Sequence, residues 1–115
     1  MNVQVGLSIM FLVSGMVMSV VALPLMRGRI PRNGIYGFRV PKTLSSDAIW
    51  YPANRFMGEE LFKCGLFITG GSLILTLVAL ILPIGLDIVG FAGLFLTMIP
   101  LLVAVVRGFK HLSKL

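Results

Sequence analysis

Charged residues are scarce in this sequence of 115 residues, and three long stretches lack them altogether. Only 12% of the residues are Asp, Glu, Lys or Arg, whereas a soluble domain has roughly 25%. Segments 3–26, 64–86 and 88–106 contain none of the four. Uncharged apolar runs of about 18 residues or more are typical of membrane-spanning helices. The lack of charge therefore argues against an ordinary soluble domain and predicts an integral membrane protein.

Cysteine and histidine are almost absent, which limits the chemistry that the chain can perform. The single Cys64 excludes an internal disulfide and a multi-cysteine metal site, and His111 stands alone near the C-terminus. No Ser-His-Asp set, Cys-His set or metal-ligand cluster is recognisable. We therefore predict no catalytic residues, no metal site and no cofactor. The net charge of +6 does not indicate nucleic-acid binding, because the cations lie beside apolar stretches.

The apolar stretches predict one all-α integral membrane domain with three transmembrane helices. The connection at 83–85 is so short that the second and third helices must form an antiparallel hairpin. The predicted parts are a transmembrane helix at about 4–26, a loop at 27–60 with a helix at about 46–58, transmembrane helices at about 61–82 and 87–106, and a tail at 107–115.

Small and hydroxyl-bearing residues recur at helical spacing along each predicted span. Close packing between membrane helices uses such stripes, within one chain or between copies of it. A polar-lined conduit is the alternative. No ionisable residue lies inside a span, which argues against a pump or a transporter of charged substrates. The residues that we expect at helix contacts include Gly15, Ser19, Gly65, Thr69, Gly71, Gly90 and Gly93.

The Lys and Arg residues predict how the chain is oriented. Seven lie in segment 27–63 and three in the tail, so three spans place all ten on one side. The N-terminus and the hairpin connection have none. Cytoplasmic loops are enriched in these residues. We therefore expect a multi-pass protein of the cell (plasma) membrane with its N-terminus outside and its C-terminus in the cytoplasm.

Aromatic residues crowd into segment 31–58, the only long part of the chain that is not built for lipid. Disordered linkers are poor in aromatic residues, so we expect an ordered segment on the inner membrane surface. Two prolines predict an irregular or extended first half, and its cations suit anionic lipid headgroups. The second half has the pattern of an interfacial amphipathic helix, with a bend at Pro52 or a start near Tyr51.

Trp50, Asn54 and Gly58 are spaced four residues apart and form one ridge of that predicted helix. Trp50 provides an indole N–H, Asn54 provides an amide, and Gly58 leaves a gap. These three features suit docking of segment 31–43 onto the ridge. Arg39 would then bond an acidic residue of the helix, or face a ligand or a lipid phosphate. Two interpretations stay open: a loop docked only on itself, or a direct binding site. The candidate acidic partners of Arg39 are Asp47 and Glu59.

The same segment contains the spacing Pro31-x-Asn33-x-x-x-Gly37-x-Arg39-x-Pro41-x-Thr43-Leu44-Ser45, followed by Trp50-x-x-x-Asn54-x-x-x-Gly58. This combination resembles the signature of the SdpI family of small bacterial and archaeal membrane proteins. The best-known member is an immunity protein. It protects its producer from a secreted, membrane-active peptide toxin and, when toxin is present, holds a transcriptional repressor at the membrane. The resemblance implies a role in binding or loop structure for Asn33, Gly37, Arg39, Pro41, Trp50, Asn54 and Gly58, to which we add Tyr36.

Three functions compete on these grounds. The first is an immunity or sensing protein whose cytoplasmic loop recognises or reports on a membrane-active peptide toxin, with a peptide or a cytosolic protein as partner. The second is a homo-oligomeric scaffold or small transport subunit packed through the small-residue stripes. The third is an enzyme acting on a lipid-linked substrate, which the lack of any catalytic spacing disfavours. All three place the protein in the lipid bilayer.

Overall fold

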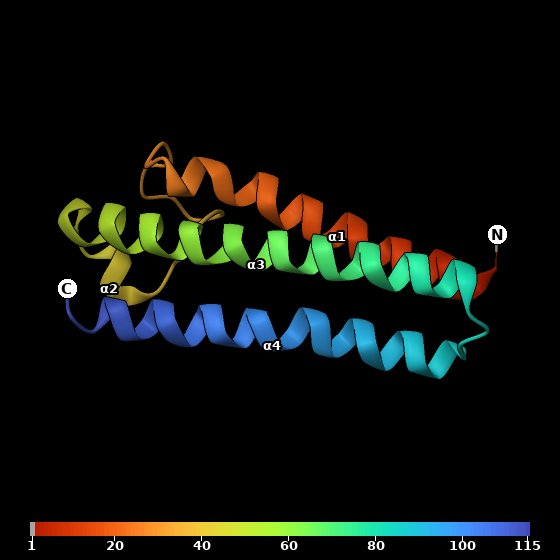
Figure 1. Cartoon of the computed structure of the whole chain (residues 1–115). Helices are drawn as coiled ribbons and strands as arrows, with labels where there is room; N and C mark the ends of the chain where they lie inside the picture. The colour runs from red at the N-terminus through yellow and green to blue at the C-terminus, as the bar shows by residue number, and fades with distance from the viewer. Residues whose placement is uncertain (1) are drawn as a thin grey trace.

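A computed structural model describes residues 2–115 as three long helices and one short helix (Figure 1). The three long helices are each long and apolar enough to cross a membrane. The chain is therefore a multi-pass membrane protein, and the prediction of an all-α fold with three transmembrane helices is confirmed. The bounds are Val3–Met26 for α1, Pro41–Leu44 for α2, Asp47–Ile81 for α3 and Leu86–Leu112 for α4.

The long helices form one elongated bundle (Figure 1). α1 and α4 both run alongside α3, and the connection between α3 and α4 lies at the same end as the N-terminus. At 1.5 Å per residue, the 35 residues of α3 account for the 53 Å length of the molecule. This length exceeds the hydrocarbon core of a bilayer, which is about 30 Å thick. One end of α3, together with the loop that packs on it, therefore extends beyond the lipid tails.

α1 and α3 approach each other so closely that two glycines leave no room for a side chain. A Cβ atom on Gly65 would lie 2.7 Å from the backbone nitrogen of Ser19, and one on Gly15 would lie 2.7 Å from that of Thr69. Backbone atoms cannot move aside as a flexible side chain can. Four of the small residues expected at helix contacts, Gly15, Ser19, Gly65 and Thr69, therefore meet where α1 and α3 pack within one chain.

α4 is held mainly by larger side chains that fill the space over glycines. The side chain of Leu96 occupies the position that a Cβ on Gly71 would take, and the ring of Phe11 does the same at Gly93. Gly90 is less crowded, with Leu7 at 3.9 Å from its Cβ position. α4 thus packs on α1 and α3 through side chains, whereas α1 and α3 meet through their backbones.

Residues 47–58 are helical, but they do not form the separate interfacial helix that the sequence predicts. They are the first part of α3, which continues into the membrane span without a break. The residues that follow Gly58 are good helix formers and include no proline, so nothing there stops a helix. α3 also continues through Pro52 and begins at Asp47 rather than near Tyr51.

The end of α1 is fixed by Gly28, which adopts the left-handed backbone conformation with φ of +68°. The Gly28 N–H donates to the carbonyl of Leu25 at 3.1 Å, and the Arg29 N–H donates to that of Pro24 at 3.0 Å. This pair of hydrogen bonds is the Schellman motif, in which a glycine without a Cβ atom reverses the chain after a helix. The chain is thereby turned back toward α3.

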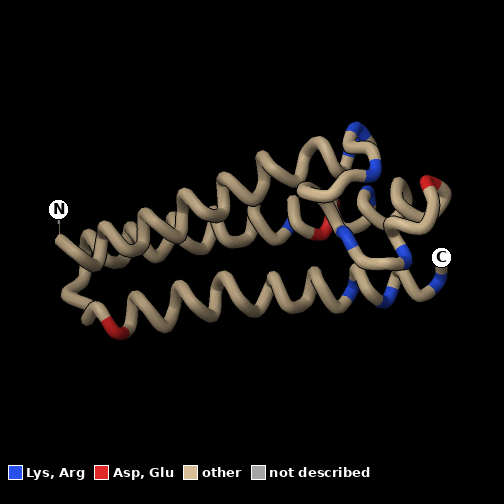
Figure 2. The backbone as a smooth tube through the Cα atoms, turned by 180° about the vertical axis from the view of Figure 1, so that it is seen from behind, with Lys and Arg blue, Asp and Glu red and all other residues tan. Residues whose placement is uncertain are grey.

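Lys and Arg residues gather at one end of the bundle, as Figure 2 shows. This end holds the loop between α1 and α3 and the C-terminus. The opposite end holds the hairpin connection, where Asp87 lies in the first turn of α4. A carboxylate is favourable there because the N-terminal end of a helix is partially positive. The bundle therefore has one strongly cationic end.

Candidate functional site

Residues 29–44, which we call the docked loop, lie on the first turns of α3 and are fixed there by two buried side chains. The indole N–H of Trp50 donates to the carbonyl of Ile30 at 2.7 Å, and Trp50 is completely buried. The Oδ1 atom of Asn54 accepts from the Phe38 N–H at 2.6 Å. Asn54 is only 2% exposed, so little water competes for this bond. Together the two side chains hold both ends of the 30–38 stretch against one helix face.

Two glycines make this close packing possible. Gly37 has φ of +116°, and a Cβ atom there would lie 2.8 Å from Oδ1 of Asn54 and 3.1 Å from the ring of Trp50. A Cβ atom on Gly58 would lie 2.5 Å from the backbone nitrogen of Met26. The sequence pattern predicted that segment 31–43 would approach Gly58. The gap at Gly58 instead receives the end of α1.

Asn33 shapes the turn at the start of the docked loop. Its Oδ1 accepts from the N–H groups of Ile35 at 2.8 Å and Tyr36 at 2.6 Å. Its Nδ2 donates to the carbonyls of Pro31 at 2.8 Å and Tyr36 at 2.9 Å. An asparagine that bonds nearby backbone groups in this way imitates a turn of the main chain. Because both the oxygen and the nitrogen of this amide bond to the loop backbone, the side chain of Asn33 stabilises the conformation of the loop.

Tyr36 ties the docked loop to α1, because its hydroxyl donates to the carbonyl of Val21. Burial removes water from the phenol and raises the pKa of Tyr36 above its ordinary value of 10.0. The hydroxyl therefore keeps its proton at neutral pH and remains a hydrogen-bond donor.

Pro41 and Thr43 build the short helix α2 inside the docked loop. The sequence predicts an irregular chain here, but Pro41 starts a helical turn, where a missing N–H costs nothing. The hydroxyl of Thr43 donates to the carbonyl of Phe38 at 2.7 Å and accepts from the Val40 N–H at 3.0 Å. Thr43 is fully buried. Thr43 belongs to the spacing that resembles the family signature, although nothing else in the sequence marks it as a site residue.

The docked loop also contacts the end of α4, which the sequence did not predict. The ammonium group of Lys42 donates to the carbonyl of Leu112 at 2.8 Å, where a cation suits the negative end of a helix. The rings of Phe38 and Phe109 pack edge to face with centroids 5.0 Å apart. These pairs are far apart in the sequence, so no local pattern marks them. One loop thus touches all three membrane helices.

Arg39 does not meet either of the acidic partners expected for it. Its Nε donates to the carbonyl of Asn33 at 3.0 Å, while Arg32 takes Asp47 in an ion pair at 2.8 Å. Arg39 is exposed. It lies at an open hollow of about 570 Å³ where guanidinium groups can bind a carboxylate or a phosphate. The hollow is lined by Pro31, Arg32, Asn33, Gly34, Arg39, Leu44, Asp47 and Tyr51.

Glu60 and Arg107 form a second ion pair, which joins α3 to α4 at 3.1 Å. The side chain of Glu60 is 9% exposed, whereas Arg107 is more than half exposed. The sequence pattern did not predict this pair. Its signal is the nearly equal distance of the two residues from the hairpin turn, which puts them at one level of an antiparallel pair. Within residues 2–115, no three His, Cys, Asp or Glu side chains gather as metal ligands.

A family model described as the SdpI/YfhL protein family matches residues 29–107. The match begins with the docked loop, includes all of α3 and covers most of α4. It confirms the resemblance that the spacing in segment 31–58 suggests. Comparisons with curated proteins and with solved structures find no match. Since the matched residues make up more than half of the chain, this protein belongs to the SdpI/YfhL family.

Proposed function

We propose that this protein is an immunity or sensing protein that responds to a membrane-active peptide, with the docked loop as its recognition or readout element. The bundle would meet the peptide within the bilayer or at the hairpin end. The docked loop would change its contacts in response and would signal to a cytosolic partner. The family membership supports this proposal, because its best-known member is an immunity protein.

The observation that carries the proposal is that the docked loop bonds to all three membrane helices. Tyr36 bonds to α1, Trp50 and Asn54 of α3 hold the loop backbone, and Lys42 bonds to the last turn of α4. A peptide that shifts one helix relative to another must strain or break some of these bonds. The loop is therefore suited to convert a change inside the membrane into a change at its surface.

The cationic end supports a cytoplasmic position for the docked loop. Lys and Arg are retained on the cytoplasmic side of membrane proteins, and this end of the bundle holds all ten of them. The cations would also attract anionic lipid headgroups, at about 1 kcal/mol for each one near the surface. A reporter that is active only in the cytoplasm should be active when fused to the C-terminus. Activity of an external reporter there would overturn this orientation.

Arg39 is the residue most suited to an external partner. It is exposed, its bond to Asn33 uses only Nε, and its hollow contains two arginines against one aspartate. An acidic segment of a cytosolic protein would find the guanidinium of Arg39 there without an acidic partner among the described residues, because Arg32 already pairs with Asp47. This assignment makes Arg39 a binding residue, whereas Asn33, Gly37, Pro41, Trp50, Asn54 and Gly58 shape the loop that presents it.

The experiment compares cells with and without the gene when they are exposed to a panel of membrane-active peptides. We expect the gene to protect against at least one peptide and Arg39→Gln to reduce that protection. Arg29→Gln is the matched control, because Arg29 is exposed in the same loop but does not line the hollow. Equal sensitivity with and without the gene across the panel would remove the immunity function. Equal effects of the two variants would remove the role of Arg39.

The alternatives have less support. An oligomeric scaffold would use the small-residue stripes, but Gly15 and Gly65 are already taken up by contacts within one chain. An enzyme acting on a lipid-linked substrate would need several free acidic groups near the loop, but Asp47 and Glu60 each pair with an arginine. Within residues 2–115, this leaves only Glu59 outside an ion pair there.

A further inference from the structure

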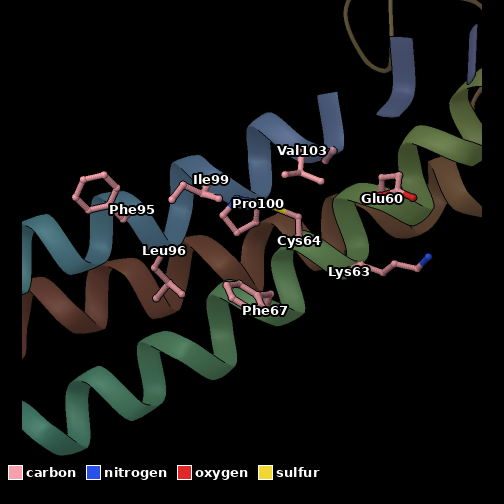
Figure 3. A pocket seen from close by; sticks show the side chains of 10 residues that line it. Glu60, Lys63, Cys64, Phe67, Phe95, Leu96, Ile99, Pro100 and Val103 are labelled. Atoms are coloured by element: carbon pink, nitrogen blue, oxygen red, sulfur yellow. The ribbon is translucent and has the colours of Figure 1, made fainter. Parts of the chain in front are cut away.

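A groove runs between α3 and α4 and is separate from the docked loop. It has a volume of about 480 Å³, within the range of sites that bind small molecules. Figure 3 shows Glu60 and Lys63 at one end of the groove and Phe95 at the other. The residues that matter for its chemistry are Glu60, Lys63, Phe67, Phe95, Ile99 and Val103.

The position of the groove along α4 places it at the level of the lipid tails. The helix rises about 30 Å between Asp87 and Arg107, which is about the thickness of the hydrocarbon core. These two charged residues therefore mark the two boundaries of the core. The groove residues of α4 lie between 95 and 104, from about the middle of the membrane toward the cationic end. Glu60 pairs with Arg107, so the Lys63 end lies near the headgroups.

The two ends of the groove differ sharply in chemistry. The charge of Glu60 is balanced by Arg107. Lys63 is exposed, and it has no ion-pair partner within residues 2–115, so this end keeps a net positive charge. Further along, Phe67 and Phe95 are both more than half exposed and are not covered by other helices. A cation above an open apolar groove complements a molecule with an anionic head and a hydrocarbon tail.

We propose that this groove binds one anionic phospholipid from the leaflet on the cationic side. Lys63 contacts its phosphate, and one acyl chain lies in the groove against Phe67, Ile99 and Val103. A long lysine side chain near the end of a membrane helix reaches naturally to the headgroup level. The proposal does not depend on an immunity role.

A second copy of the chain is a less suitable occupant. Copies inserted in the same direction would bring their cationic ends to the same level, so that basic residues would face Lys63. Like charges facing each other across an interface are unfavourable. An anionic lipid headgroup instead brings an opposite charge to Lys63, whereas a zwitterionic headgroup brings no net charge.

Native mass spectrometry tests the proposal on the full-length protein released from vesicles of equal parts phosphatidylglycerol and phosphatidylethanolamine. We expect one phosphatidylglycerol to stay bound in preference to phosphatidylethanolamine. Lys63→Gln should lower that preference about fivefold, which corresponds to one lysine near an anionic headgroup. Lys63→Arg should preserve it. Val103→Trp should displace the lipid by filling the groove.

Two matched controls separate the groove from general effects. Lys114→Gln removes a cation from the tail, and Val106→Trp adds the same bulk to an exposed position of α4 outside the groove. Both should retain phosphatidylglycerol. Equal retention of the two lipids by the native protein would overturn the proposal. The proposal would also be overturned if neither Lys63→Gln nor Val103→Trp changed the amount of bound lipid, or if the two control variants lost lipid equally. A dimer of the native protein without bound lipid would overturn it as well.

Discussion

Replacing Asn54 with leucine should release the docked loop from α3. Leucine has a similar volume but provides no acceptor, so the Phe38 N–H that now bonds to Oδ1 at 2.6 Å loses its partner. Leaving a buried donor without an acceptor costs about 1–3 kcal/mol. Since 1.4 kcal/mol corresponds to a factor of ten, the Phe38 amide should exchange its hydrogen about 5 to 140 times faster.

Hydrogen–deuterium exchange in nanodiscs measures this directly on peptides that contain Phe38. Peptides from 64–81 serve as the internal reference, because a variant that unfolds as a whole would lose protection there as well. Glu59→Leu is the matched control, since it introduces the same side chain at an exposed position of the same helix. Native-like exchange at Phe38 in the Asn54→Leu variant would show that Asn54 does not hold the loop.

Two further predictions concern the helix contacts. Gly58→Ala should lower stability by about 1–3 kcal/mol, because the new Cβ would lie 2.5 Å from the backbone nitrogen of Met26. Gly70→Ala should instead raise stability by up to about 1 kcal/mol, since nothing lies within 4 Å of its Cβ position and alanine favours a helix. Thermal unfolding in detergent compares the two variants. An equal loss of stability in both would refute the close approach of Gly58 to the backbone of Met26. Arg107→Gln should destabilise the protein by about 1–2 kcal/mol, and by more than Glu60→Gln does. The reason is that Arg107→Gln leaves the carboxylate of Glu60, the less exposed partner, without an opposite charge. The same unfolding assay would contradict this if the order were reversed.

The membrane helices were predictable because lipid imposes a simple condition. A backbone in hydrocarbon must satisfy its own hydrogen bonds, so an apolar stretch of sufficient length must be helical. The same reasoning failed at the boundary near Gly58. Beyond Lys63 the sequence becomes uncharged and apolar, but this change does not mark the start of a new helix, because α3 runs through it without a break.

The site was predictable in its local parts only. The spacing of Trp50, Asn54 and Gly58 identified the helix face on which the loop and the end of α1 pack, because side chains four residues apart share a face. Of the two possibilities for Arg39, the acidic partner is not found, since the turn around Asn33 places Arg32 rather than Arg39 beside Asp47.

The long-range contacts of the site carry no local signal in the sequence. Lys42 bonds to Leu112, and Glu60 pairs with Arg107, each across two different helices or segments. These pairs depend on how the bundle assembles. The antiparallel hairpin puts Glu60 and Arg107 at one level, but the residues that flank them in the chain do not show that they pair.

Trp50 gives the protein a built-in optical probe. It is the only tryptophan in the chain, and its indole N–H is the group that holds Ile30. Any event that lifts the docked loop would expose this ring to water and shift its fluorescence to longer wavelength. The emission of the unlabelled protein should therefore report loop release in real time, during titration with a peptide, a lipid or a cytosolic partner.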